Sequence, residues 1–233
     1  YKTVFLSCSA DQLAPSAEAY RKHGIAIGAV YVGATVSEDS VAYSIPLQSV
    51  FEVLDGRGMI LVHVGAAKGA QVSDDRLVAV LRELATEAAE HNVGVAIYPH
   101  VGNRLPTVES ALAIAEAVDH PNLGVCLNLC HYLKQHPPQG IFDAARKARP
   151  LLKMVTINGA DTGDTQSMGW DRLIQPLGQG SFDVAGFVRF VEHDLNFDGP
   201  VYVQLYNVKT PAESLIASTM AAWKAMHEPA AKR

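Results

Sequence analysis

The chain has 233 residues, of which 48% are hydrophobic, 7% aromatic and 18% charged, and its formal net charge at pH 7 is −5. This length suits a single domain, and the composition supplies a core of Val, Leu, Ile and Ala. The negative charge, with no cluster of Lys or Arg, argues against a nucleic-acid partner, because surfaces that bind phosphates need concentrated positive charge. No apolar stretch reaches the roughly 20 residues of a membrane span, so no membrane partner is expected.

The three cysteines are Cys8, Cys126 and Cys130. If Cys126 and Cys130 share a strand, they lie about 13 Å apart, which is too far for a disulfide. We therefore expect buried thiols in a reducing compartment, and hence a cytoplasmic protein. A cleaved leader stays open, because the chain begins at Tyr1 without an initiator Met.

Short runs rich in Val, Ile and Leu recur along the chain and are apolar nearly throughout, which is typical of parallel strands buried on both faces. The predicted strands are Thr3–Ser7, Ile25–Val32, Met59–Val64, Val93–Tyr98, Gly124–Asn128, Lys153–Asn158 and Val201–Tyr206. Their regular spacing predicts seven strand–helix units with right-handed crossovers.

Helix-periodic segments lie between these strands. Ser73 precedes a run with helical spacing and is a predicted N-cap, as is Asp183. Thr210, Pro211 and Glu213 form a predicted capping box before the last helix. Periodicity alone leaves an open doubly wound sheet and a barrel short of one unit as alternatives. Because no strand is followed by G-x-G-x-x-G, a dinucleotide cofactor is not expected.

Polar residues follow four of the predicted strands, and in parallel barrels such strand ends carry the active site. They include Tyr98 and His100, Asn128 and His131, Thr156, Asn158 and Asp161, and Gln204 and Tyr206, while His63 lies near the end of an earlier strand. A buried polar group without a partner costs about 1–3 kcal/mol, so such a set favours a pocket for a hydroxyl-rich, sugar-sized ligand. The alternative is that each side chain only satisfies nearby loop backbone.

Several of these segments resemble motifs of the xylose isomerase-like TIM barrels, which include sugar phosphate isomerases, ketose epimerases and endonuclease IV. Gly124–His131 reads Gly-Val-Cys-Leu-Asn-Leu-Cys-His and resembles the family pattern G-V-x-x-D-x-x-H, while Leu177–Asp183 resembles L-G-x-G-x-h-D. Val93–Gly102, Val155–Asp161 and Val201–Tyr206 also match. The resemblance covers the whole chain and implies one domain, residues 1–233, with the (β/α)8-type TIM-barrel fold. Thr3–Ser7 would then be the second strand, leaving seven of eight units.

The resemblance also implies a divalent metal held by Glu, Asp, His and Glu, with the two Glu residues acting as acid and base. The matching positions hold Tyr98, Asn128, Thr156 and Gln204, so the metal site is degenerate. Amides and hydroxyls are poor ligands for a hard cation, and they are not general bases near neutral pH. No cofactor is therefore predicted. A zinc site made of His63, His100 and His131 is the alternative.

The predicted catalytic residues are His131, which matches the family histidine that contacts substrate, and His100, because a histidine exchanges protons near pH 6.5. The predicted substrate-binding residues are Tyr98, Asn128, Lys134, Thr156, Asn158, Asp161, Arg172, Gln204 and Tyr206. Lys134 or Arg172 could stabilise an oxyanion.

These residues indicate a sugar isomerase or epimerase of carbohydrate metabolism, acting without the usual metal on a small sugar, keto-sugar or polyol derivative. Its partner would be a small carbohydrate. A homo-oligomer could cover the edge of the Thr3–Ser7 strand. The alternative is a non-catalytic barrel that binds a carbohydrate or a protein partner. DNA repair is disfavoured, since it needs several metal ions and a surface that attracts phosphate.

Overall fold

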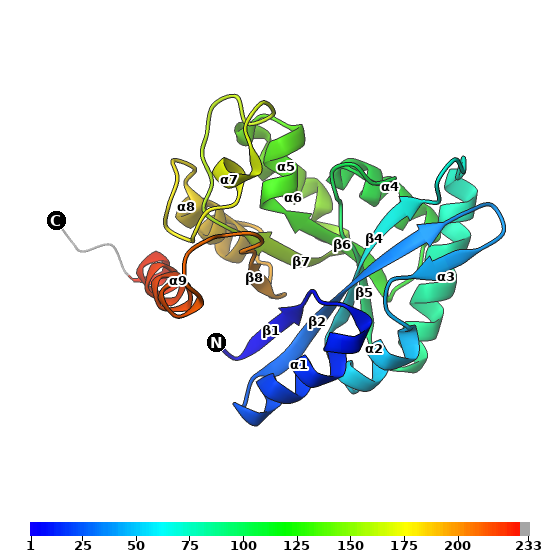
Figure 1. The fold of residues 1–233 in the computed structure, drawn as a ribbon. Helices are drawn as coiled ribbons and strands as arrows, with labels where there is room; N and C mark the ends of the chain where they lie inside the picture. Colours follow the sequence, from blue (N-terminus) through cyan, green and yellow to red (C-terminus); the bar gives the residue numbers. More distant parts are fainter. Residues whose placement is uncertain (229–233) are drawn as a thin grey trace. The chain divides into compact units, whose positions relative to one another are not determined.

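The computed structural model describes residues 1–228, in which parallel strands alternate with helices (Figure 1). The hydrogen-bonding order of the strands is β1-β2-β4-β5-β6-β7-β8, and β3 pairs with β2 outside this path. The chain divides into two compact units. The first holds Tyr1–Leu127 and Pro150–Met154, and the second holds Asn128–Arg149 and the chain from Val155 onward. The predicted α/β class and the seven predicted strands are confirmed.

The first unit contains most of the strands. Its elements are β1 (Thr3–Leu6), α1 (Ala10–Lys22), β2 (Ala26–Val36), β3 (Val41–Tyr43), α2 (Leu47–Leu54), β4 (Met59–Ala66), α3 (Asp74–Glu90), β5 (Gly94–Ile97), α4 (Val108–Val118) and β6 (Leu123–Asn128), whose last residue begins the second unit. β2 and β4 pair in parallel over eight positions, from Ala29↔Met59 to Val36↔Ala66. All residues of β6 are buried, as expected for a strand covered on both faces.

Helices cover this sheet through apolar faces that the sequence encodes. α1 and α2 pack on β2, while α3 packs on β5 and against α4. On α3, Leu77, Leu81 and Leu84 are fully buried. Ser73 caps the helix as predicted, since its hydroxyl accepts the backbone N–H of Arg76. The helical spacing of the Leu residues thus places one face of α3 in the core.

A hairpin between β2 and β3 was not predicted. β2 continues to Val36, beyond the predicted end at Val32, and β3 pairs with it antiparallel, from Ala34↔Tyr43 to Val36↔Val41. The turn is closed by Ser37, whose hydroxyl accepts the N–H of Ser40. A strand of three residues is too short to produce a periodic signal, so only the polar Ser-Glu-Asp-Ser turn marked this hairpin in the sequence.

The second unit is richer in helices. Its elements are α5 (Leu129–Gln135), η1 (Pro138–Gly140), α6 (Ile141–Ala148), α7 (Trp170–Leu173), α8 (Val184–Arg189), the π-helical turn η3 (Phe190–Asp194), β8 (Val201–Val203) and α9 (Ala212–His227). η2 (Arg149–Leu151) and β7 (Leu152–Ile157) run from one unit to the other. β7 and β8 pair in parallel, from Val155↔Val201 to Ile157↔Val203.

An aromatic cluster joins α6 to α8 and η3. The ring of Phe142 meets those of Phe187 and Phe190 edge-on, at centroid distances of 5.8 and 5.0 Å. Asp183 caps α8 as predicted, because its carboxylate accepts the N–H of Gly186. The predicted capping box at Thr210 is wrong, since α9 begins at Ala212 with Pro211 at the cap position and no side-chain hydrogen bond there.

Cys8, Cys126 and Cys130 are all reduced thiols. Cys126 lies in β6, whereas Cys130 lies in α5, so the assumption that both share a strand is wrong. Burial raises the pKa of the Cys130 thiol to about 12, which makes it unreactive at neutral pH. Among the helices within residues 1–228, none combines the length and apolarity that a bilayer crossing requires.

The segment after β7 returns to the sheet through a turn that depends on glycine. Gly180 has φ +85°, and a Cβ there would lie 2.1 Å from the carbonyl oxygen of Ala160. Gly163, in the same segment, has φ +108°, but a Cβ there would meet only the flexible end of Met168 at 3.6 Å.

We expect Gly180→Ala to lower the free energy of unfolding by about 2–4 kcal/mol, because it adds a backbone collision to the strained φ. The matched control Gly163→Ala should cost only about 1 kcal/mol. Urea denaturation of both variants measures the difference. Equal costs would contradict the close approach of Gly180 to Ala160.

Candidate functional site

In the first unit, four aromatic side chains gather from β2, from β4 and from the segment that follows β5. The imidazole of His63 stacks on the ring of Tyr31, with centroids 4.6 Å apart and an interplanar angle of 14°. The ring of Tyr98 meets Tyr31 edge-on at 5.0 Å, and His100 lies 5.7 Å from His63. The strand register explains the grouping, because Gly33 pairs with His63 and the N–H of Tyr98 donates to Val62.

The imidazole of His63 is neutral at physiological pH. Burial, aided by the neighbouring His100, lowers the pKa of His63 to about 4. The side chain of Asn103 donates from Nδ2 to Nδ1 of His63 at 2.7 Å. Because an amide N–H can only donate, Nδ1 must be the unprotonated nitrogen, and Nε2 carries the hydrogen.

His100 takes the opposite tautomer. Its Nδ1 lies 2.8 Å from the carbonyl oxygen of Val101, which can only accept, so Nδ1 carries the hydrogen. The lone pair of the neutral ring is therefore on Nε2. Burial lowers the pKa of His100, so this basic form predominates at neutral pH. The predicted catalytic residue His100 thus has the protonation state that a general base needs.

In the second unit, Asn128 performs a structural task. Its Oδ1 accepts the backbone N–H of His131 and the thiol of Cys130, both at 3.0 Å, and so caps α5. His131 is 6% exposed, and its ring meets that of Trp170 edge-on at 5.1 Å. The cap fixes the first turn of α5, and with it the position of His131.

Two buried side chains, Thr156 on β7 and Asn158 directly after it, retain unused hydrogen-bonding capacity. Thr156 is 0% exposed and its hydroxyl has no hydrogen-bond partner in the structure. Asn158 is 1% exposed; its Nδ2 donates to the carbonyls of Gly159 and Leu173, while its Oδ1 has no partner. Unsatisfied buried polar atoms are rare, so both are candidates for binding a ligand or an ordered water.

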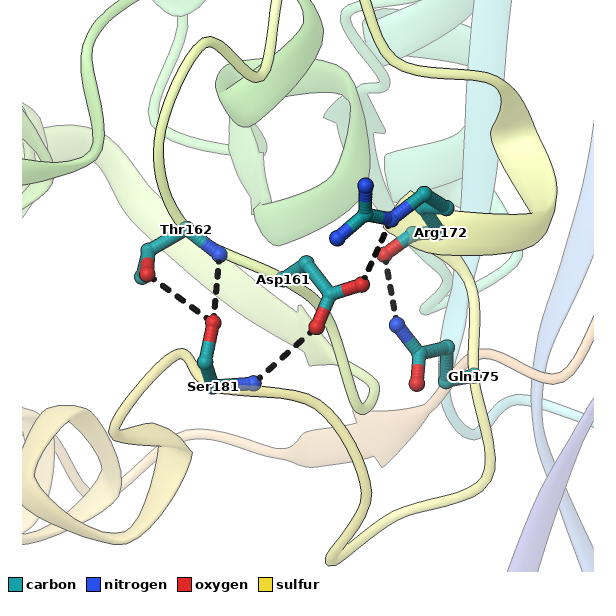
Figure 2. A network of polar contacts seen from close by, with 5 residues as sticks. All are labelled: Asp161, Thr162, Arg172, Gln175 and Ser181. Atoms are coloured by element: carbon teal, nitrogen blue, oxygen red, sulfur yellow. Dashed lines mark hydrogen bonds and ion pairs between the residues drawn. The ribbon is translucent and has the colours of Figure 1, made fainter.

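The segment after β7 is ordered by a polar network (Figure 2). Arg172 Nε donates to Asp161 Oδ2 at 2.8 Å, and the N–H of Ser181 donates to the other carboxylate oxygen. Ser181 Oγ accepts the N–H of Thr162, and Gln175 Nε2 donates to the carbonyl of Arg172. Figure 2 shows these contacts joining the start of the segment to its end, while the terminal nitrogens of Arg172 carry no contact within the network.

Three other predicted binding residues lie elsewhere in the second unit. Lys134 Nζ donates to the carbonyls of Gln166 and Met168, both at 2.7 Å, and so ties α5 to the segment after β7. The N–H of Gln204 donates to Ile157 just beyond β8. Tyr206 is 72% exposed. Substrate binding by these residues stays a prediction.

The metal that the family resemblance implies does not fit the residues present. The four matching positions offer a phenol, two amides and a hydroxyl, and Asn128 Oδ1 already accepts two hydrogen bonds. None of these groups carries the negative charge that a hard divalent cation requires. Within residues 1–228 no group of three or more His, Cys, Asp or Glu side chains could hold a metal ion, so the three-histidine zinc alternative finds no support.

Sequence reasoning missed Tyr31 and Asn103. Tyr31 interrupts an otherwise apolar strand, and this was a usable signal for a side chain that faces a site. Asn103 lies in a turn where its N–H donates to His100, and nothing local connects it with His63, forty positions away.

Loss of the Asp161 charge should loosen the segment after β7. We expect Asp161→Asn to speed hydrogen exchange at the amides of Ser181 and Gln175, with little change in Tm because the ion pair with Arg172 is exposed. Asp164→Asn, an exposed carboxylate of the same segment, is the control. Unchanged exchange in Asp161→Asn would show that backbone contacts alone order the segment.

The lowered pKa of His63 predicts a pH dependence of stability. Below pH 6.5 the imidazole of His63 binds a proton in the unfolded chain, whereas in the folded protein it binds one only near pH 4. The free energy of unfolding therefore falls as the pH is lowered across this window. Between pH 6.5 and 4, wild type should lose about 1–2 kcal/mol more than His63→Gln. Urea unfolding across this range measures both proteins, and parallel curves would rule out a buried neutral His63.

Comparisons with known proteins agree with this architecture. The family model described as "Xylose isomerase-like TIM barrel" matches residues 15–226. The IolI protein with a bound zinc atom has a similar structure, with a TM-score of 0.70, 18% identity, and coverage of 97% of this chain and 88% of that chain. D-psicose 3-epimerase from Clostridium cellulolyticum H10, with D-tagatose, gives a TM-score of 0.66, 15% identity, and coverage of 97% and 88%.

A third similar structure is 3-keto-D-glucoside 4-epimerase YcjR from E. coli, with a TM-score of 0.64, 16% identity, and coverage of 92% of this chain and 85% of that chain. No curated protein matches the sequence significantly. At these identities the structures support the fold, while the family model matches most of the sequence. The alternation of buried strands and helices, the strand order and this match lead to one conclusion: the chain belongs to the xylose isomerase-like TIM-barrel family.

Proposed function

We propose that the chain is a sugar isomerase or epimerase that moves a proton next to the carbonyl of a small sugar, keto-sugar or polyol derivative, and that it does so without a divalent metal. The observation that carries this proposal is the tautomer of His100, whose Nδ1–H donates to Val101 and whose Nε2 is basic. Structures similar to this chain include sugar epimerases, one of them with D-tagatose. These neighbours suggest the class of ligand.

The proposed chemistry needs a base and hydrogen-bond donors. His100 or His131 removes the proton from the carbon beside the carbonyl, and negative charge develops on the carbonyl oxygen. Return of the proton to the former carbonyl carbon, with transfer of the adjacent hydroxyl proton to the former carbonyl oxygen, gives the isomer. Return of a proton to the opposite face of the same carbon regenerates the carbonyl and gives the epimer. Hydrogen-bond donors must stabilise the oxygen while it is charged, and the terminal nitrogens of Arg172 are suited to this.

Neutral polar groups would hold the hydroxyls of the sugar. Thr156 and Asn158 have buried oxygen atoms without partners, and a sugar hydroxyl could satisfy them. In the second unit, Asn128, Gln204 and Tyr206 complete the proposed set, with Asp161 and Lys134 holding the surrounding backbone. Such a set suits an uncharged polyol better than a phosphate, because most of its members are neutral.

A carbohydrate-binding protein without catalysis is the second candidate. The unsatisfied oxygens of Thr156 and Asn158 favour it, since binding alone would satisfy them. A binder and an isomerase share these contacts and differ in whether a carbon-bound proton is exchanged.

Proton exchange from a ketose in D₂O tests the proposal. D-tagatose, D-psicose and D-fructose are incubated with the protein, with and without EDTA, and loss of the proton beside the carbonyl is followed by ¹H NMR. We expect exchange that EDTA does not affect, and a loss of about 10²–10⁴-fold in His100→Ala or His131→Ala, whichever removes the base. The control is His193→Ala, an exposed histidine outside the site.

The outcomes separate the candidates. Full exchange in both variants would end the acid–base roles of His100 and His131. Inhibition by EDTA, together with stoichiometric metal in elemental analysis, would overturn the metal-free proposal. A rise in Tm with a ketose but no exchange would favour the binder.

A further inference from the structure

We propose that His63 is a neutral hydrogen-bond donor, held in its Nε2–H tautomer by Asn103, and that this N–H binds the carbonyl or hydroxyl oxygen of the ligand. The inference rests on the proposed function for the class of ligand. It assigns to His63 and Asn103 a role in polarising the substrate oxygen. Asn103 acts as a positioning residue, because it contacts His63 and not the ligand.

Three contacts fix the orientation of the His63 ring. Stacking on Tyr31 at an interplanar angle of 14° sets the plane of the imidazole. The 2.7 Å hydrogen bond from Asn103 keeps the Nδ1 edge of the imidazole turned toward Asn103. At Gly33 a Cβ would lie 2.8 Å from Nε2 of His63, so only glycine leaves room for this edge of the ring. A ring held in plane, in rotation and in position is preorganised for binding.

Asn103 is itself held by backbone geometry. Its N–H donates to the carbonyl of His100, closing a turn in which Gly102 has φ +89°. The next residue, Arg104, donates its N–H to Val64 on β4. The turn therefore presents the Asn103 amide to His63 with both flanks anchored to the sheet. The same turn positions His100, so the donor and the base share one support.

Within residues 1–228, the Nε2–H of His63 has no hydrogen-bond partner. Among residues 1–228, the hydrogen bond of His63 is the one from Asn103, and its other contacts are between rings. A neutral imidazole N–H is a suitable donor to a developing oxyanion, because it keeps its proton without adding charge to a buried site. Burial supports this state by lowering the pKa of His63 to about 4.

The tautomer is tested by ¹⁵N–¹H correlation spectra of the imidazole nitrogens in the full chain at pH 7. Wild type should show a protonated Nε2 and an unprotonated Nδ1 at His63. In Asn103→Asp the carboxylate accepts a hydrogen bond, so the proton should move to Nδ1 or the ring should become charged, and the pKa of His63 should rise. The matched control Asn196→Asp, an exposed residue in a turn, adds the same charge and should change neither nitrogen.

Ligand contact is tested with D-tagatose. Where D-tagatose raises Tm, the ¹⁵N shift of His63 Nε2 should change on titration, and the dissociation constant should rise about 3–10-fold in Asn103→Asp. Asn103→Gln should restore part of the affinity, since it can still donate an amide N–H.

The results distinguish this proposal from the proposed function. A protonated Nδ1 or a charged His63 ring in wild type at pH 7 overturns the role of His63 even if ketoses are turned over. Binding of D-tagatose without any change at His63 Nε2 also overturns it. If no ketose binds or reacts, the proposed function fails, and the wild-type spectrum alone decides whether Asn103 holds the Nε2–H tautomer.

Discussion

Burial of parallel strands on both faces is the constraint that organises this molecule. Every residue of β6 is buried, and the inner positions of β4 and β7 admit almost no solvent. Apolar side chains therefore fill most strand positions, with Lys153 of β7 as an exception, and polar groups collect near the strand ends. Tyr98 and Asn158 lie just beyond such ends, whereas His63 lies within β4, three residues before its last residue, Ala66. Most of the side chains that we propose as a ligand site lie at or near these ends.

Most of the polar groups near these strand ends are neutral, and neutral groups are poor ligands for a hard divalent cation. Asn128 caps α5, and Asn158 holds two loop carbonyls, so part of the amide capacity serves local structure. Three histidines, His63, His100 and His131, lie among these neutral groups. Burial keeps the first two neutral, and their contacts give them opposite tautomers. The ring of His63 thus presents a hydrogen-bond donor and the ring of His100 a basic nitrogen, and neither ring carries a net charge.

The long segment after β7 shows how order arises without regular secondary structure. Gly159 and Gln175 exchange backbone hydrogen bonds, and Asp161 holds Arg172 and the amide of Ser181. The arginine pair keeps the pKa of Asp161 below its usual value, so these contacts persist at neutral pH. Residues predicted to bind substrate therefore also shape the loop that would surround it.

The sequence by itself determined the α/β class, the seven strands and the starts of α3 and α8, because apolar periodicity and the caps Ser73 and Asp183 are local properties of the chain. It also located His100, Asn128 and Asn158 at strand ends. Only the tertiary structure decided that Asn128 caps a helix, that Thr156 lacks a partner, and that Asn103 selects the tautomer of His63. Such facts depend on contacts between residues far apart in the chain, and side-chain direction and hydrogen-bond pairing arise only when the strands and loops are packed together.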